Sequence, residues 1–172
     1  MSAVQACEIP PHALLRRYLD GGGFADCYAV DVAGTVTQAA FVEAFYTSSL
    51  FKIERWILKV LAASPSTDAQ ARQLAAGELT EFAAWTVESQ TPAQLLLADV
   101  SGRTRSWLMA SPTASPPAAP RTRLHFGSAV VPRRAAPGEA PSLGWLFGSL
   151  LAFHRLYSRL LLRAASRRVR PG

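Results

Sequence analysis

The sequence contains no asparagine, only two cysteines and only two lysines among its 172 residues. Without asparagine it has no acceptor for N-linked glycans. Cys7 and Cys27 are too few for a disulfide scaffold or a cysteine-built zinc site. No apolar run reaches the ~20 residues that a membrane-spanning helix requires, and the first thirty residues lack the basic and apolar regions of a secretory signal. We therefore expect a cytoplasmic protein in which both thiols are reduced.

Motifs for metal binding and catalysis are also missing. His12, His125 and His154 fall in three separate predicted elements, and no HxH or HExxH pair is present. The Gly21-Gly22-Gly23 run is not followed by Lys-Ser/Thr, so it predicts a helix end and a turn rather than a phosphate loop. Ser128 in FGSAV does not match the G-x-S-x-G nucleophile elbow. We predict no metal, no cofactor and no evident catalysis, while the question of an enzymatic activity stays open.

The composition is that of a folded domain. Hydrophobic residues make up 49% of the chain and charged residues 17%, which is too apolar for a disordered protein. A chain of this length forms one domain with a core of its own.

The net charge of +6 is unevenly distributed. Acidic residues outnumber basic ones up to Pro120, whereas the chain from Arg121 onward contains ten arginines and only one acid, Glu139. Such asymmetry is typical of proteins that bind an anionic membrane surface or nucleic acid. The excess of arginine over lysine also fits a GC-rich coding sequence, which needs no anionic partner.

The first half of the chain predicts one strand and several helices. A short helix is expected over 11–19, with Pro11 at its start, and a strand over 24–32. Apolar residues at spacings of three and four predict helices over 37–47 and 50–62, with a break at Thr47-Ser48-Ser49. A further helix is expected over 68–76, capped by Ser66 or Thr67 and ended by Gly77.

The second half predicts strands followed by one long helix. Strand patterns cover 80–90, 94–100, 103–111 and 121–131, and the two-residue link Ser101-Gly102 indicates a hairpin. From Ser142, a candidate N-cap, a helix is expected to run to about Arg168. One of its sides is apolar and includes Leu160. Another side carries arginines at a spacing of four, namely Arg155, Arg159, Arg163 and Arg167. This side is where an anionic membrane or nucleic acid would bind.

Three segments carry a resemblance to a known superfamily. LLLADVSGRTRSWL, TRLHFGSAVVP and LLAFHRLYSRLLLRAA are similar to a family of uncharacterised bacterial proteins in the START/Bet v 1-like (SRPBCC) helix-grip superfamily, and the order of elements over residues 10 to 165 resembles it too. The resemblance implies a cavity between the sheet and the long helix, where relatives bind lipids, sterols or polyketides. About five strands are predicted here, against seven in a full helix-grip sheet, so the cavity is expected to be small, open or filled by side chains.

The predicted fold is therefore α+β, with a curved antiparallel sheet of reduced strand number wrapped around a long C-terminal helix. An N-terminal arm with a short helix (1–23) precedes a single helix-grip-like domain (24–169), and residues 170–172 form a basic end.

Two sets of candidate site residues follow from these patterns. Aromatic side chains that either line a ligand cavity or only fill the core are Tyr28, Phe45, Trp56, Trp85, Trp107, Phe126, Phe153 and Tyr157. Arg103 and Arg105 share one side of a predicted strand, as do Arg123 and His125. If those strands pair, the four side chains could form one anion-binding patch; they could equally be solvent-facing residues paired with acids.

The function expected from these features is binding of a small apolar or amphipathic molecule without catalysis. Two alternatives remain: an enzyme of the polyketide-cyclase or hydrolase type that uses ionisable residues facing the pocket, or a module that binds anionic membrane or nucleic acid through the arginine stripe. A homodimer is possible, because Gly144, Gly148 and Ala152 would let another helix approach closely.

Overall fold

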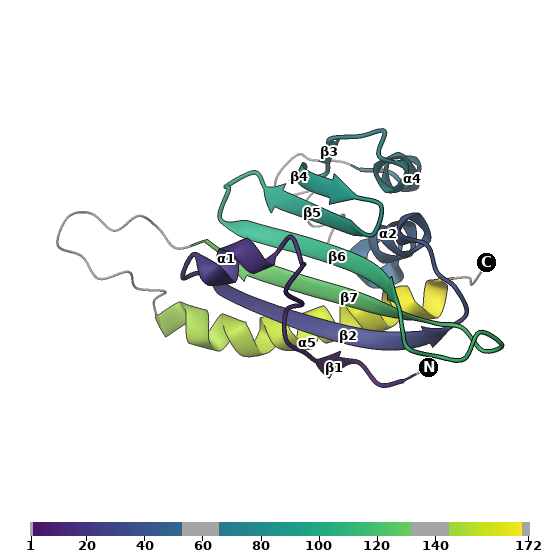
Figure 1. The fold of residues 1–172 in the computed structure, drawn as a ribbon. Coiled ribbons are helices and arrows are strands. Elements are labelled where there is room, and N and C mark those ends of the chain that lie inside the picture. The colour runs from purple at the N-terminus through teal and green to yellow at the C-terminus, as the bar shows by residue number, and fades with distance from the viewer. Residues whose placement is uncertain (1, 53–65, 132–144, 170–172) are drawn as a thin grey trace.

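The computed structural model describes residues 2–52, 66–131 and 145–169 (Figure 1). These residues form an α+β fold around one antiparallel sheet with the strand order β1-β2-β7-β6-β5-β4-β3. The strands are β1 (Gln5–Ala6), β2 (Phe24–Ala33), β3 (Glu81–Phe82), β4 (Trp85–Thr91), β5 (Gln94–Asp99), β6 (Thr104–Pro112) and β7 (Arg121–Val130). The helices are α1 (Arg16–Asp20), α2 (Gln38–Tyr46), α4 (Asp68–Ala76) and α5 (Trp145–Arg168). The predicted antiparallel sheet and long C-terminal helix are confirmed.

The sheet is wider than predicted. Its two edge strands, β1 and β3, have two residues each and bring the described sheet to seven strands. Strands this short show no alternation of polar and apolar residues, so the predicted count of about five is too low. The first long strand, β2, pairs with the last one, β7, along its whole length, and β3 to β7 follow one another as a meander.

Helices α2 and α4 begin where the sequence predicts. The Thr37 hydroxyl oxygen accepts a hydrogen bond from the backbone N–H of Ala40, which caps α2. Thr67 and Gln70 form a reciprocal capping box at the start of α4, and Gly77 ends this helix with a φ of 78°. α2 ends before Thr47, as expected; most of the helix predicted over 50–62 lies outside the described residues.

The first helix is shorter than predicted. α1 covers Arg16–Asp20, so Pro11 does not start it. The side chain of Gln94 on β5 explains the difference, because its Oε1 accepts from the Leu14 N–H at 2.8 Å and its Nε2 donates to the His12 carbonyl at 3.1 Å. These long-range bonds hold the segment before α1 in turns.

Two predicted strand boundaries also change. The segment 80–90 is divided into β3 and β4, because Ala83 adopts a φ of 53° and turns the chain. The hairpin of β5 and β6 is confirmed, but its loop has four residues rather than two. The Asp99 carboxylate organises this loop by accepting from the N–H groups of Arg103 and Thr104, both at 2.8 Å.

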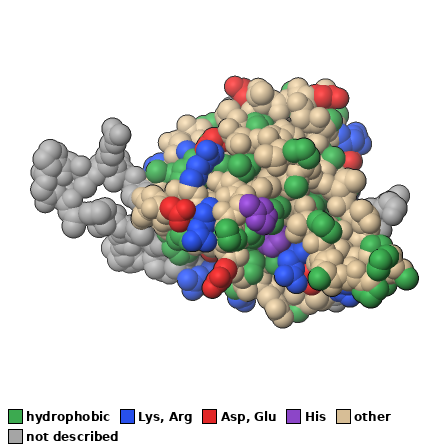
Figure 2. Space-filling model, in the orientation of Figure 1, with side chains coloured by type: hydrophobic (Ala, Val, Ile, Leu, Met, Phe, Trp, Pro, Cys, Tyr) green, Lys and Arg blue, Asp and Glu red, His purple; other side chains and the backbone are tan. Residues whose placement is uncertain are grey.

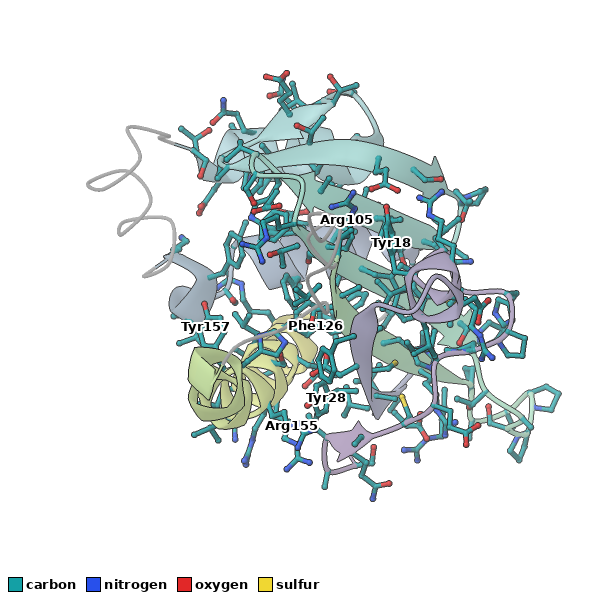
Figure 3. The ribbon with its side chains drawn as sticks, turned by 90° about the vertical axis from the view of Figure 1, so that its left-hand side faces the viewer. Tyr18, Tyr28, Arg105, Phe126, Arg155 and Tyr157 are labelled. Carbon is teal, nitrogen blue, oxygen red and sulfur yellow. The ribbon has the colours of Figure 1, made fainter. Side chains whose placement is uncertain are left out.

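The sheet separates two hydrophobic cores. Its inner face is covered by α2, α4 and α5, whereas its outer face is covered by α1 and the segment before it (Figure 3). Alternation along β2 illustrates the division, since Tyr28 and Val30 point inward and Cys27 points outward. The inner cluster includes Phe41, Phe45, Tyr46, Phe51, Phe82, Leu108, Leu124 and Phe126. The outer cluster consists of Ile9, Ala13, Leu15, Cys27, Leu96, Trp107, Met109 and Ala129.

Helix α5 packs on the inner face through a narrow stripe. Leu161, Leu162 and Ala165 are buried, but Leu156 is 57% exposed and Leu160 is 43% exposed. The prediction that Leu160 lies on the buried side is therefore wrong. The stripe that the sheet and α2 cover is narrower than the apolar side of the helix, which leaves two leucines in contact with solvent. Ser142 lies outside the described residues.

Candidate functional site

Aromatic rings from α2, the segment after α2, β3 and β7 meet in the inner cluster. The ring centroid of Phe45 lies 4.8 Å from that of Phe126 and 6.0 Å from that of Phe51. Tyr46 contacts Phe51 and Phe82, with centroid separations of 4.8 and 5.2 Å. Such edge-on and tilted contacts between rings are typical of a packed apolar core. The described side chains at the centre of this cluster therefore fill the space between them.

The predicted cavity residues are divided between the two faces. Tyr28, Phe45 and Phe126 are buried in the inner cluster, and Trp85 and Tyr157 pack against it. Figure 3 shows Tyr28, Phe126 and Tyr157 on the α5 side of the sheet. Trp107 is buried in the outer cluster, so the sheet separates it from the others. Trp56 lies outside the described residues, and so does the side chain of Phe153.

A groove opens at the edge of the inner cluster, between α2 and the C-terminal end of α5. Its volume is about 560 Å³. Ala40, Ala44 and Thr47 line it from α2, and Arg167 and Arg168 line it from α5, together with Glu43 and Val169. Two arginines and small apolar side chains thus share one concave surface. We call this surface the α2–α5 groove.

Among the predicted site residues that the structure describes, only Arg167 lines the α2–α5 groove. Its apolar side comes from Ala40 and Ala44, which are four residues apart and therefore on the same side of α2. Two features of the sequence could have indicated this groove. They are the spacing of these alanines and the pair of arginines at the predicted end of α5. Neither feature indicates that α2 and α5 would face each other.

A polar cluster joins α5 to the inner face of the sheet. The Ser128 hydroxyl donates to Asp26 Oδ1 at 2.7 Å and lies 2.7 Å from His154 Nε2. The Tyr28 hydroxyl donates to Asp26 Oδ2 at 3.2 Å. Burial favours the neutral carboxyl, but hydrogen bonds from His154 and Ser128 outweigh it and lower the pKa of Asp26. Sequence reasoning considered Ser128 alone and missed this cluster, because its three elements are distant in the chain.

This cluster does not have the geometry of a hydrolase triad. In a triad the histidine contacts the serine through one ring nitrogen and the carboxylate through the other. Here His154 Nε2 approaches both Ser128 Oγ, at 2.7 Å, and Asp26 Oδ2, at 3.5 Å. The serine is buried and already donates to Asp26. The arrangement holds α5 against β2 and β7 rather than activating a nucleophile.

The four predicted anion-binding residues do not form one patch. β6 and β7 pair, but their register places Arg105 opposite Ala129 and Arg123 opposite Ser111. These two positions are six residues apart along β6, or roughly 20 Å. Arg103 is exposed in the loop before β6.

Arg105 is used to attach α1 to the sheet. Its Nε donates to the Tyr18 hydroxyl at 2.8 Å and to the Glu88 carboxylate, which also binds Arg17. A β-bulge between Val87 and Ser89 accompanies the outward position of Glu88. Figure 3 shows Tyr18 and Arg105 close together on the side opposite α5. The alternative interpretation from the sequence, in which the arginines pair with acidic side chains, therefore describes Arg105 well.

Arg123 and His125 lie at the other end of the outer face. Arg123 forms a two-pronged ion pair with Asp31, with N–O distances of 2.7 and 2.9 Å. Burial, with the nearby Arg123 charge, lowers the pKa of His125 to about 4. Both line a groove of about 670 Å³ that also contains His12 and Arg121. Figure 2 shows histidine and basic side chains near the middle of this face.

The arginine stripe of α5 is exposed as its spacing suggests. Arg155, Arg159, Arg163 and Arg167 all face solvent. Arg159 also lies over the Tyr28 ring, 5.5 Å from its centroid. The exposed Leu156 and Leu160 interleave with these arginines, so this surface is amphipathic.

Comparisons with known proteins assign no family to this chain. Protein-family models, curated proteins and solved structures all fail to match this chain. In the described ranges no three histidine, cysteine, aspartate or glutamate side chains gather as metal ligands would. None of the helices in those ranges has the length and apolar character to cross a membrane.

Proposed function

We propose that this protein is a small-molecule-binding domain of the helix-grip type that takes an amphipathic ligand with an anionic group into the α2–α5 groove. The apolar part of the ligand would lie between α2 and α5, toward the inner cluster, and its anionic group would pair with Arg167 and Arg168. A cytoplasmic location and membership of the START/Bet v 1-like superfamily are parts of the same proposal.

The order of elements supports the helix-grip part of the proposal. β2 precedes the helices, the meander β3 to β7 follows them, and β7 returns to pair with β2. α5 then packs on β2, β7 and α2 (Figure 1). This agrees with the resemblance in sequence, which implies a ligand site between sheet and closing helix.

The α2–α5 groove is the observation that carries the ligand-binding part. It combines a volume suited to a small molecule with small side chains from α2 and two guanidinium groups from α5. Arginine binds carboxylate or phosphate groups through charge-assisted hydrogen bonds. Glu43, at the same rim, would disfavour binding of a second anionic group.

Titration with a fluorescent amphipathic anion, 1-anilinonaphthalene-8-sulfonate, and competition with decanoate test this proposal. We expect saturable fluorescence that decanoate reverses. Replacing Ala40, which lines the groove, with tryptophan should weaken binding about tenfold or more, because the indole fills the groove. Ala39→Trp is the matched control, since Ala39 is the neighbouring α2 residue, exposed and outside the groove.

Equal affinities of the A40W and A39W variants would overturn the placement of the ligand. The R167Q/R168Q variant should weaken decanoate more than decanol, because only decanoate has a charge to lose. An equal loss for both probes would show that the arginines do not contact the anionic group.

A second candidate function, binding to an anionic lipid surface through α5, is favoured by Leu156 and Leu160. Their exposure beside Arg155, Arg159 and Arg163 combines apolar and cationic groups as an interfacial helix does. Leucines would contribute little to nucleic-acid binding, so this surface favours lipid.

Co-sedimentation with vesicles containing phosphatidylglycerol distinguishes this candidate. We expect binding that falls several-fold in both L156S/L160S and R159Q/R163Q variants. Binding lost only in the arginine variant, and equally strong to duplex DNA, would indicate a general polyanion surface and contradict the lipid assignment.

A further inference from the structure

The two cysteines, which are 20 positions apart in the sequence, lie side by side in the fold. Sγ of Cys7 is 3.1 Å from Sγ of Cys27. The register of β1 on β2 continues to this pair, since Ala6 is opposite Tyr28 and the Cys7 N–H donates to the Cys27 carbonyl at 3.0 Å. Directly opposite residues in such an antiparallel pair have Cα atoms about 5.5 Å apart, within the range that disulfides span.

The two thiols differ in their access to solvent. Cys27 is buried in the outer cluster, between the sheet and the segment before α1. Cys7 is only partly buried and lines a groove of about 320 Å³ together with Asp31 and Arg123. A small oxidant in solution can therefore reach Cys7 but not Cys27.

The surroundings of Cys7 also favour its reactive form. A hydrogen bond from Cys27 and the charge of Arg123 lower the pKa of the Cys7 thiol, against the opposing effect of partial burial. The hydrogen bond with Cys7 and burial raise the pKa of Cys27. Because the thiolate is the nucleophile, the accessible sulfur reacts first.

We propose that Cys7 and Cys27 form a thiol pair that a hydroperoxide oxidises to an intramolecular disulfide. The Cys7 thiolate attacks the terminal oxygen of the hydroperoxide, so that an S–O bond forms, the O–O bond breaks and an alcohol or water leaves. Cys27 then attacks the Cys7 sulfenic acid, the S–S bond forms, and the S–O bond breaks to release water. Two thiols are oxidised, and one hydroperoxide is reduced to an alcohol, or to water when it is hydrogen peroxide.

The disulfide would attach the N-terminal segment covalently to β2. Residues between the two cysteines include α1 and most of the chain that covers the outer cluster. Closing this loop restricts the unfolded chain, so oxidation stabilises the attachment of the outer-face cover.

Mass spectrometry of the full chain treated with hydrogen peroxide tests the proposal. After denaturation and alkylation with N-ethylmaleimide, we expect a species about 2 Da lighter than the reduced chain that carries no maleimide. Its Tm should exceed that of the reduced protein by on the order of 5–10 °C. Dithiothreitol should reverse both changes.

Two serine variants separate the roles of the thiols. Cys27→Ser should stop at a Cys7 sulfenic acid that dimedone traps, whereas Cys7→Ser should leave Cys27 at least tenfold less reactive toward peroxide. Two maleimides on the peroxide-treated wild-type chain would overturn the proposal. A dimer linked between chains, or faster reaction at Cys27 than at Cys7, would do so too.

Discussion

The two faces of the sheet are stabilised in different ways. The inner face is covered by the three helices α2, α4 and α5, and its cluster is dominated by phenylalanine and leucine. The outer face is covered by a short N-terminal segment whose position depends on individual contacts, namely those of Gln94, Glu88 and Cys27. Apolar volume stabilises one face, whereas specific polar and sulfur contacts define the other. We expect the inner face to control global stability, the outer face to respond to oxidation, and the two faces to respond to pH in different ranges.

Truncation of Phe45 should have the largest effect on stability. Phe45 is fully buried and its ring contacts four other aromatic rings. Phe45→Ala should lower the free energy of unfolding by about 3–5 kcal/mol, measured by urea denaturation. Val100→Ala, at a position that is 78% exposed, is the control and should change it by less than about 0.5 kcal/mol. A loss under about 1 kcal/mol in F45A would mean that the inner cluster is not the main source of stability.

Protonation of His125 should give the outer face a distinct pH dependence. The folded pKa of about 4 lies below the ordinary value of 6.5, so the unfolded chain binds more protons between these values. The contribution of neutral His125 to the free energy of unfolding is therefore fully present above about pH 6.5. It falls by roughly 3 kcal/mol as the pH drops toward 4. Urea denaturation from pH 7 to pH 4 should show this decrease in the free energy of unfolding in the wild type, and a smaller decrease in His125→Gln. An unchanged slope in H125Q would contradict the assignment.

The inner polar cluster should respond at lower pH than His125. The pKa of Asp26 is lowered from 3.8 in the folded protein. Its contribution to the free energy of unfolding is therefore present above that value and lost as the pH falls through the folded pKa. Asp26→Asn should remove this loss below about pH 4 and, at neutral pH, cost about 1–3 kcal/mol. If D26N changed the free energy of unfolding only between pH 4 and 6.5, the groups on the two faces would not titrate separately.

A methyl group at Gly127 should disturb the packing of the outer cover against the sheet. A Cβ at this position would lie 2.7 Å from Leu15 Cδ2 and 2.8 Å from the Asp26 carbonyl oxygen. Because a backbone atom cannot move away easily, we expect Gly127→Ala to cost about 1–3 kcal/mol. Hydrogen exchange should increase first in residues 9–18. Ala129→Gly, on the same strand and face, is the comparison; equal exchange of the N-terminal segment in both variants would contradict a specific clash.

The smallest effect is expected from the Glu88 cluster. Glu88 is partly exposed and holds Arg17, Tyr18 and Arg105 at the surface. Glu88→Gln should change the free energy of unfolding by less than about 1 kcal/mol, because solvent screens these pairs. Hydrogen exchange at α1 should nevertheless become faster. Glu81→Gln, which changes an exposed acid on β3, is the control. An equal loss of stability and of exchange protection in this variant would show that the pairing of Glu88 has no role.

Local elements were predictable because they depend on residues a few positions apart. The helices α2 and α4 and the four long strands other than β4 fall within one or two residues of the predicted bounds. The failures have tertiary causes. Gln94 holds residues 12–14 out of α1, the left-handed Ala83 divides one strand, and the coverage of α5 leaves Leu160 exposed.

Candidate sites were less predictable than elements, since they depend on register. The predicted patch required Arg105 and Arg123 to lie close together, but the register of β6 on β7 separates them. The same pairing, extended through β2 and α5, joins Asp26, Ser128 and His154, which no local pattern connected.

By itself, the sequence determined which segments become strands or helices and which side of each is apolar, because these properties follow from backbone preferences and short-range periodicity. Only the tertiary structure decided which of those sides meet. Two thiols 20 positions apart became neighbours, and small residues of α2 came to face arginines at the end of α5. Strand register and helix packing bring such groups together through the burial of the whole core, which no short segment specifies alone.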